Sequence, residues 1–240
     1  MPHLFVNRPR QHDLFATAPA RRNHVLWEMI NGVVYLVGGV LFVLGSVLFF
    51  PTLSAYADLG AWIFAVGSVL YLVVTGHDLA EVLRRRRVRE GPPTPLERLD
   101  AWAAVTYVSG TLAFLIGSIF FLSSVGLYDA GAWCFIIGSL LFVVGAVVNV
   151  LQIVRAADFL TLQLMNLTAL TFVTGSVIFA LASIPYLWHF ESEADERLVE
   201  GFLAWQFVVG SALFLLGGAL NAWRARRFIR HEAGVRSRAA

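Results

Sequence analysis

Six long runs without a charged residue constrain this chain more than any other feature. The runs cover residues 29–57, 59–77, 101–128, 130–154, 159–190 and 201–223, and the shortest has 19 residues. A helix needs about 20 apolar residues to cross the hydrocarbon core of a membrane. The runs lack strict period-two alternation, so helices are predicted rather than the strands of a membrane barrel. The sequence therefore predicts an all-α integral membrane protein with six transmembrane helices.

The composition agrees with this class. Apolar residues make up 58% of the 240 positions and charged residues only 14%, whereas about a quarter of a typical soluble domain is charged. Because Cys134 is the only cysteine, a disulfide framework or a cysteine-based metal site within one chain is excluded. The first 27 residues contain no apolar core of signal-peptide length, and we expect them to form a cytoplasmic arm.

The runs belong to one two-helix unit that occurs three times. One segment reads GAWIFAVGS from Gly60, GAWCFIIGS from Gly131 and LAWQFVVGS from Leu203. The companion segment that precedes it reads GGVLFVLGS from Gly38, GTLAFLIGS from Gly110 and GSVIFALAS from Gly175. Repetition at a nearly constant spacing reflects the architecture of a protein. The sequence predicts three parallel hairpin repeats, for which pseudo-threefold symmetry is one arrangement.

Polar segments set the expected boundaries. We predict a cytoplasmic arm over residues 1–27, hairpin repeats over 28–88, 100–157 and 158–230, a cytoplasmic linker over 89–99 and a basic tail over 231–240. In the linker, Thr94, Pro95 and Glu97 match a capping box with proline at the first helical position, so a helix is expected to begin there. Seventeen of the 18 arginines lie in the arm, the connections between repeats and the tail. Both termini are therefore predicted to be cytoplasmic.

Glycine and serine recur in pairs on the predicted helix faces. The pairs are Gly45 and Ser46, Gly67 and Ser68, Gly117 and Ser118, Gly138 and Ser139, and Gly210 and Ser211. Small residues let helix backbones approach closely inside a membrane, so helix packing is the preferred interpretation. The serine hydroxyls can bond to their own helix or to a neighbour. The alternative is that these pairs line a path for an ion or a small solute.

Acidic and amide side chains stand at repeated positions. Asp58 and Asp129 each precede a repeated tryptophan by four residues, which favours a role at a helix N-terminus. Sixteen residues after each tryptophan come Asp78, Asn149 and Asn221, about 24 Å further along the helix. These three form a candidate polar cluster for a cation, a water or a lipid headgroup, since carboxylates inside membranes are costly. Alternatively, Asp78 is hydrated at the interface and the asparagines form interhelical hydrogen bonds.

Basic residues predict contact with anionic lipid headgroups on the cytoplasmic side. They are Arg84, Arg85, Arg86 and Arg87, and in the last repeat Arg224, Arg226, Arg227 and Arg230. Nucleic acid is not an expected partner, because the topology already accounts for these charges. The spans contain no zinc-protease motif, phosphate loop or paired carboxylates. No catalytic residue, metal or cofactor site is predicted, and we do not expect an enzyme.

The repeated F-x-x-G-S and A-W-x-F-x-x-G-S segments resemble the YrhK-like domain, a bacterial membrane module of two helices. The resemblance covers about residues 28–84, 100–155 and 165–227, which makes three tandem copies. It implies a location in the bacterial inner membrane and no catalytic residue. In the third copy Ala182 and Leu203 stand where the other copies have glycine.

Two classes of function stay open at this point. The first is a structural or interaction protein that packs through its glycine, serine and aromatic helix faces and binds lipids, a second copy of itself or other membrane subunits. The second is a small channel or transporter with a path among the three hairpins. The residue types favour the first class, and a measured flux would separate the two.

Overall fold

A computed structural model describes residues 18–88, 91–151 and 159–239, and this part of the chain is helical without strands. Its six long helices are α1 (Ala18–Leu48), α2 (Ala57–Val88), α3 (Pro95–Phe120), α4 (Tyr128–Leu151), α5 (Phe159–Ser183) and α6 (Glu193–Ala239). Two short 3-10 segments, η2 (Pro51–Tyr56) and η3 (Ile184–Leu187), lie in the first and third hairpin loops. The all-α prediction is confirmed for these residues.

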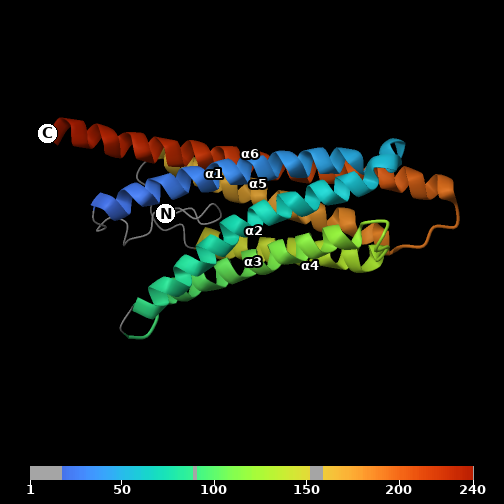
Figure 1. Ribbon diagram of the computed structural model, residues 1–240, viewed down its shortest axis with the longest axis horizontal. Coiled ribbons are helices and arrows are strands. Elements are labelled where there is room, and N and C mark those ends of the chain that lie inside the picture. Colours follow the sequence, from blue (N-terminus) through green and yellow to red (C-terminus); the bar gives the residue numbers. More distant parts are fainter. Residues whose placement is uncertain (1–17, 89–90, 152–158, 240) are drawn as a thin grey trace.

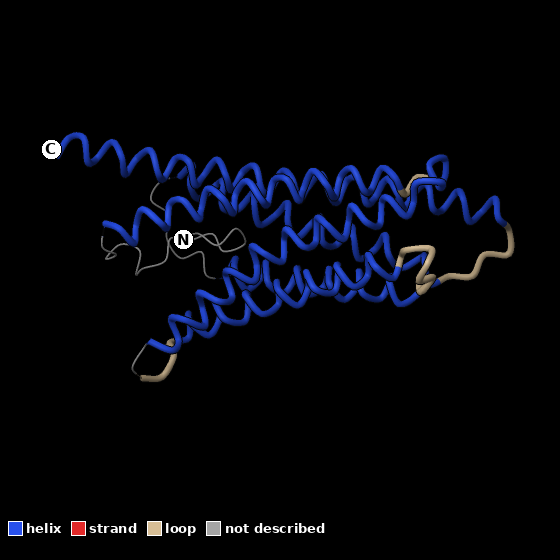
Figure 2. The backbone as a smooth tube through the Cα atoms, viewed as in Figure 1, coloured by secondary structure: helices blue, strands red, loops and turns tan. Residues whose placement is uncertain are grey.

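The helices run back and forth between two ends of an elongated bundle (Figure 1). The loops within the three hairpins gather at one end, which we name the hairpin-loop end. The start of α1, the end of α6 and the connection from α2 to α3 lie at the other end, named the linker end (Figure 2). Each hairpin therefore begins and ends on the same side of the molecule, as expected for parallel repeats.

Local chemistry explains where two of the helices begin. The Thr94 hydroxyl accepts a hydrogen bond from the Glu97 backbone N–H, and the Glu97 carboxylate accepts one from the Thr94 N–H at 2.8 Å. This capping box starts α3 at Pro95, as the sequence predicts. At α6, the Ser192 hydroxyl accepts a hydrogen bond from the Ala194 N–H, and acidic residues fill the first turn, where the helix dipole favours them.

Two helix ends differ from the predicted boundaries. Helix α1 begins at Ala18, inside the segment expected to be a loose arm, and α6 continues to Ala239 through the predicted basic tail. Both extensions are rich in alanine and arginine, which have high helix propensity. An apolar run marks the membrane-spanning part of a helix but not its polar continuation. The connection from the second to the third hairpin, residues 152–158, lies outside the described residues.

The six helices close into a ring. Each helix packs against its neighbours in sequence, and α6 packs against α1, the first helix of the chain. The Ser46 and Ser211 hydroxyls lie 2.9 Å apart across this closing seam. The outward surface is apolar: Val66, Ile137 and Val209 are each about half exposed. Helices α2 to α6 are long and apolar enough to cross a membrane, and the corresponding part of α1, Gly32–Leu48, is shorter. The fold is thus compatible with a membrane protein.

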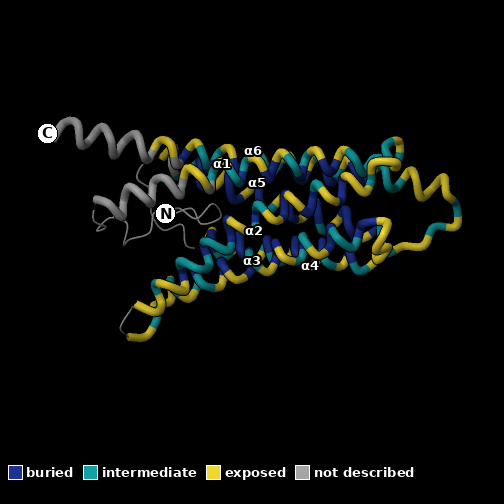
Figure 3. The backbone as a smooth tube through the Cα atoms, in the orientation of Figure 1, coloured by how far each residue is buried: buried dark blue, intermediate teal, exposed yellow. Residues whose placement is uncertain are grey.

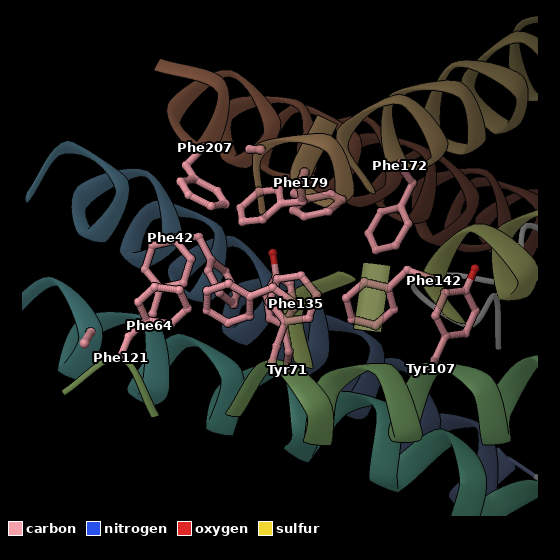
Figure 4. Close-up of a cluster of buried hydrophobic side chains, with 14 of the residues drawn as sticks. Phe42, Phe64, Tyr71, Tyr107, Phe121, Phe135, Phe142, Phe172, Phe179 and Phe207 are labelled. Carbon is pink, nitrogen blue, oxygen red and sulfur yellow. The ribbon is translucent and has the colours of Figure 1, made fainter. Parts of the chain in front are cut away.

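Aromatic rings fill the interior of the ring of helices (Figure 4). The repeated phenylalanines supply the central levels, and Phe64, Phe114, Phe135 and Phe179 are each no more than 1% exposed. They contact one another between hairpins: the centroids of Phe114 and Phe179 lie 5.5 Å apart and those of Phe64 and Phe179 lie 6.2 Å apart. These separations are typical of packed aromatic pairs. Buried residues run along the inner side of the helices, and exposed ones lie outside (Figure 3).

Candidate functional site

The glycine and serine pairs lie inside the bundle. All ten of these residues are buried, and they adjoin the aromatic interior. Ser46 and Ser118 each donate a hydrogen bond of 2.7 Å to the carbonyl oxygen four residues earlier. Ser46 also contacts Ser211 on α6. Ser46 thus lies in a seam between α1 and α6, which is the arrangement that membrane helices use for packing.

Glycine brings the two helices of a hairpin together. In the second hairpin, a Cβ atom added at Gly110 would lie 3.0 Å from the Gly138 carbonyl oxygen, and one added at Gly138 would lie 3.0 Å from the Gly110 oxygen. Gly45 and Gly60 approach each other in the same way near the outer end of the first hairpin. A side chain at any of these positions would crowd the facing backbone, so glycine favours the close approach.

The three residues of the candidate polar cluster are all buried at the linker end. Asp78 is 5% exposed, Asn149 is 2% and Asn221 is 3%. The burial of Asp78 disagrees with the part of the alternative that hydrates it at the interface, whereas Asn149 agrees with the part that gives the asparagines interhelical hydrogen bonds. The Asn149 amide donates a hydrogen bond of 2.8 Å to the Tyr107 hydroxyl on α3, and Asp78 lies close enough to Tyr107 to act on it electrostatically. Tyr107 thus lies in contact with Asn149 and within electrostatic range of Asp78.

Asn221 contacts Arg224, which the sequence predicted to lie at the lipid headgroups. Its side-chain oxygen accepts a hydrogen bond from the guanidinium of Arg224, one helical turn further along α6. Arg224 is only 5% exposed, so it is not a headgroup-binding residue as predicted. The signal for this contact was the spacing of three between an amide and an arginine on one helix. Joint binding of a cation by Asp78, Asn149 and Asn221 stays a prediction.

The other predicted headgroup residues lie at the surface of the linker end. Arg84, Arg86 and Arg87 are exposed near the end of α2, and Arg85 is half-buried. Arg226 and Arg227 are exposed on α6. Arg230 is not among the residues whose side chains the structure describes. Helices α2 and α6 therefore both carry exposed positive charge at the same end of the bundle.

A cavity of about 650 Å³ opens at the hairpin-loop end, and we name it the vestibule. Aromatic side chains line it, among them Phe49, Phe121, Tyr128, Tyr186, Trp188 and Phe190, together with the carboxylates of Asp58, Asp129, Glu196 and Glu200. Asp58 does not simply cap its own helix. It accepts hydrogen bonds from the backbone N–H and the hydroxyl of Ser123, in the loop of the second hairpin.

Sequence reasoning missed the vestibule. Asp58 and Asp129 were assigned separately to helix N-termini, and the aromatic residues of the loops were not assigned to a site. The available signal was the coincidence of both residue types in the loops of all three hairpins. Among the described residues, no three histidine, cysteine, aspartate or glutamate side chains are placed to share a metal ion.

The fold defines the class of protein as a helical bundle built from two-helix hairpins with an apolar exterior. The model of the YrhK-like protein family matches the chain twice, over residues 25–83 and 97–154. These matches coincide with the first and second hairpins, and these two hairpins belong to the YrhK-like family. The third hairpin, predicted from its motifs to be another copy, lies outside the matched residues. No curated protein and no solved structure matches the chain.

Proposed function

We propose that this protein is a six-span protein of the bacterial inner membrane whose role is structural: it binds lipids and other membrane subunits, or a second copy of itself, and carries out no catalysis. In this proposal the third hairpin is a further YrhK-like unit, and both termini lie in the cytoplasm. The arginines at the linker end support that orientation, because cytoplasmic segments of membrane proteins are enriched in arginine and lysine.

The packed aromatic interior supports this proposal more than any other observation. A path for a solute along the axis would have to pass Phe64, Phe114, Phe135 and Phe179, which are almost fully buried against one another. Opening such a path would separate rings that contact each other across hairpins. Each aromatic pair of this kind contributes about 0.5–1.5 kcal/mol beyond the burial of its area. The alternative of a channel or transporter is therefore disfavoured.

The exterior supports binding of membrane components. Trp62, Trp133 and Trp205 occupy the same position in each repeat and are all more than half exposed. Tryptophan is enriched where proteins meet the membrane interface. Together with the exposed arginines at the linker end, they would fix the depth of the bundle in a lipid bilayer. No residue of the described part is assigned a catalytic role or a cofactor.

A flux measurement tests this function. The full chain is reconstituted into liposomes, and potassium release and glycerol-driven swelling are recorded at increasing amounts of protein. We expect permeability equal to that of protein-free liposomes. A double variant, Phe114→Ala with Phe179→Ala, removes two central rings and is expected to leak if it folds. Permeability that rises with the amount of the unmodified protein would contradict the proposal and support the channel.

A further inference from the structure

The vestibule lies where the third hairpin departs from the repeat. In the first hairpin the outer glycines, Gly45 and Gly60, bring the two helices together. The third hairpin has Ala182 and Leu203 at the equivalent positions, so the same approach of backbones is not available there. Trp205 follows Ser183 by 22 positions, whereas Trp62 follows Ser46 by 16. The loop of the third hairpin, η3 and residues 188–192, therefore leads into a longer outer extension of α6, which begins at Glu193. Leu203 and this loop form one side of the vestibule, which is therefore a feature that the repeat alone does not explain.

The vestibule has the size and the lining of a ligand site. Its volume of about 650 Å³ falls within the range of about 300–1,000 Å³ that is typical of small-molecule pockets. Phe49, Phe121 and Tyr186 come from three different hairpins and lie against one another, with the Phe121 and Tyr186 centroids 5.2 Å apart and those of Phe49 and Phe121 6.3 Å apart. The same rings line the cavity and contact Phe64, Phe135 and Phe207 of the aromatic interior.

The charged side chains that line the vestibule are carboxylates, so the lining is negative. Four carboxylates line the vestibule, together with His189 and without an arginine. Arg197 lies close enough to Glu200 to act on it electrostatically, but it is not part of the lining. An anion would therefore be repelled. A cation would find carboxylates and the faces of aromatic rings together, and both attract positive charge.

We propose that the vestibule binds an organic ammonium ion. The aromatic lining favours an ammonium group that carries carbon substituents over a bare metal ion, because such a group loses less hydration when it contacts rings. Two sources present this chemistry at a membrane surface: a free alkylammonium compound and the headgroup of an ethanolamine lipid. The proposal adds a binding site to the structural role described above and does not depend on it.

Binding of free cations is tested with the full chain purified in a maltoside detergent, which contributes no ammonium group. Tetramethylammonium and ethanolamine are titrated by calorimetry at constant ionic strength, with sodium as the reference. Glu200→Gln removes a carboxylate from the lining of the vestibule, and Trp188→Leu removes an aromatic ring. We expect each variant to bind the cations about threefold or more weakly. Glu193→Gln is the matched control: this glutamate is exposed at the start of the same helix and does not line the cavity.

Binding of a lipid headgroup is tested in vesicles of phosphatidylglycerol with and without phosphatidylethanolamine. Native mass spectrometry then measures how much ethanolamine lipid stays bound after extraction, for the unmodified chain and the same variants. Loss of retention in Glu200→Gln and Trp188→Leu, without binding of free cations in detergent, assigns the site to the headgroup. Calorimetric binding that both variants weaken assigns it to free cations.

Two results would overturn the proposal. One is the absence of both free-cation binding and selective lipid retention in the unmodified chain. The other is an equal effect of the control Glu193→Gln, which would indicate attraction by the overall charge of this end and not a site. Circular dichroism and gel filtration check each variant for folding. If Glu200→Gln does not fold, Asp129→Asn replaces it, because Asp129 is exposed and also lines the vestibule.

Discussion

At the scale of single residues, the glycines of this bundle lie in two distinct environments. Gly138 faces a neighbouring helix, where an added Cβ atom would lie 2.7 Å from the Phe114 ring and 3.0 Å from the Gly110 carbonyl oxygen. Gly76, further along α2, has nothing within 4 Å of the same position. The first glycine is needed for packing, and the second only lowers the stability of its helix, since glycine has a poor helix propensity.

This contrast predicts opposite effects of one substitution. Gly138→Ala should destabilise the protein by about 1–3 kcal/mol, because it overpacks a seam whose nearest atoms include rigid backbone. Gly76→Ala should be neutral or stabilising by up to about 1 kcal/mol. Thermal unfolding in detergent measures both, and each variant serves as the control for the other. Equal melting temperatures for the two variants would show that the close approach at Gly138 is not required.

The burial of the polar residues was only partly predictable from the sequence. The burial of the serines follows from their position beside the repeated glycines, which the sequence displays directly. The inward position of Arg224 was not predictable, because arginines at the end of a membrane helix commonly reach the lipid headgroups. Its contact with Asn221 joins residues three apart on one helix, but its burial depends on how α6 is rotated in the ring. That rotation is set by contacts with other helices.

At the scale of elements, the end of α2 carries exposed arginines that do not take part in the packing of the bundle. Arg84, Arg86 and Arg87 are exposed in the last turns of this helix. Positive charge there also interacts favourably with the C-terminal end of the helix dipole. The element is thus suited to hold the linker end of the bundle against an anionic membrane surface.

Replacement of the four arginines, Arg84 to Arg87, by glutamine should reduce retention of anionic lipid. Each basic residue near an anionic surface contributes about 1 kcal/mol of attraction, so the amount of phosphatidylglycerol that copurifies should fall by at least severalfold. Native mass spectrometry measures the bound lipid. Arg197→Gln is the control, because this arginine is exposed at the hairpin-loop end. The same loss of lipid in that variant would contradict a specific role for α2.

At the scale of the whole molecule, the orientation in the membrane is open to a direct test. We expect the hairpin-loop end to face the periplasm. In a Cys134→Ala background, cysteines introduced at Ala55 or Ser192 should react with a membrane-impermeant reagent added to intact cells, whereas one at Thr94 should react only after lysis. Labelling yields measured by mass spectrometry decide the result. Reaction of Thr94→Cys in intact cells would reverse the predicted topology.

The sequence by itself determined the parts of this protein that depend on local information. Long uncharged runs specify helices of membrane-spanning length, the capping box at Thr94 fixes the start of α3, and the repeated segments specify hairpins. These features hold in any arrangement of the helices, because backbone hydrogen bonds and capping are completed within a few residues. For this reason the helical class was predictable, and helix ends in polar segments were less so.

Only the tertiary structure decided how the hairpins close and what lies at the ends of the ring. The seam between Ser46 and Ser211 joins residues 165 positions apart, and the contact of Asp58 with Ser123 spans 65 positions. The vestibule likewise combines loops from all three hairpins. Such features depend on the rotation and spacing of helices, which are set by the packing of side chains between segments far apart in the chain. A pattern read along the sequence contains the residues of these contacts but not their pairing.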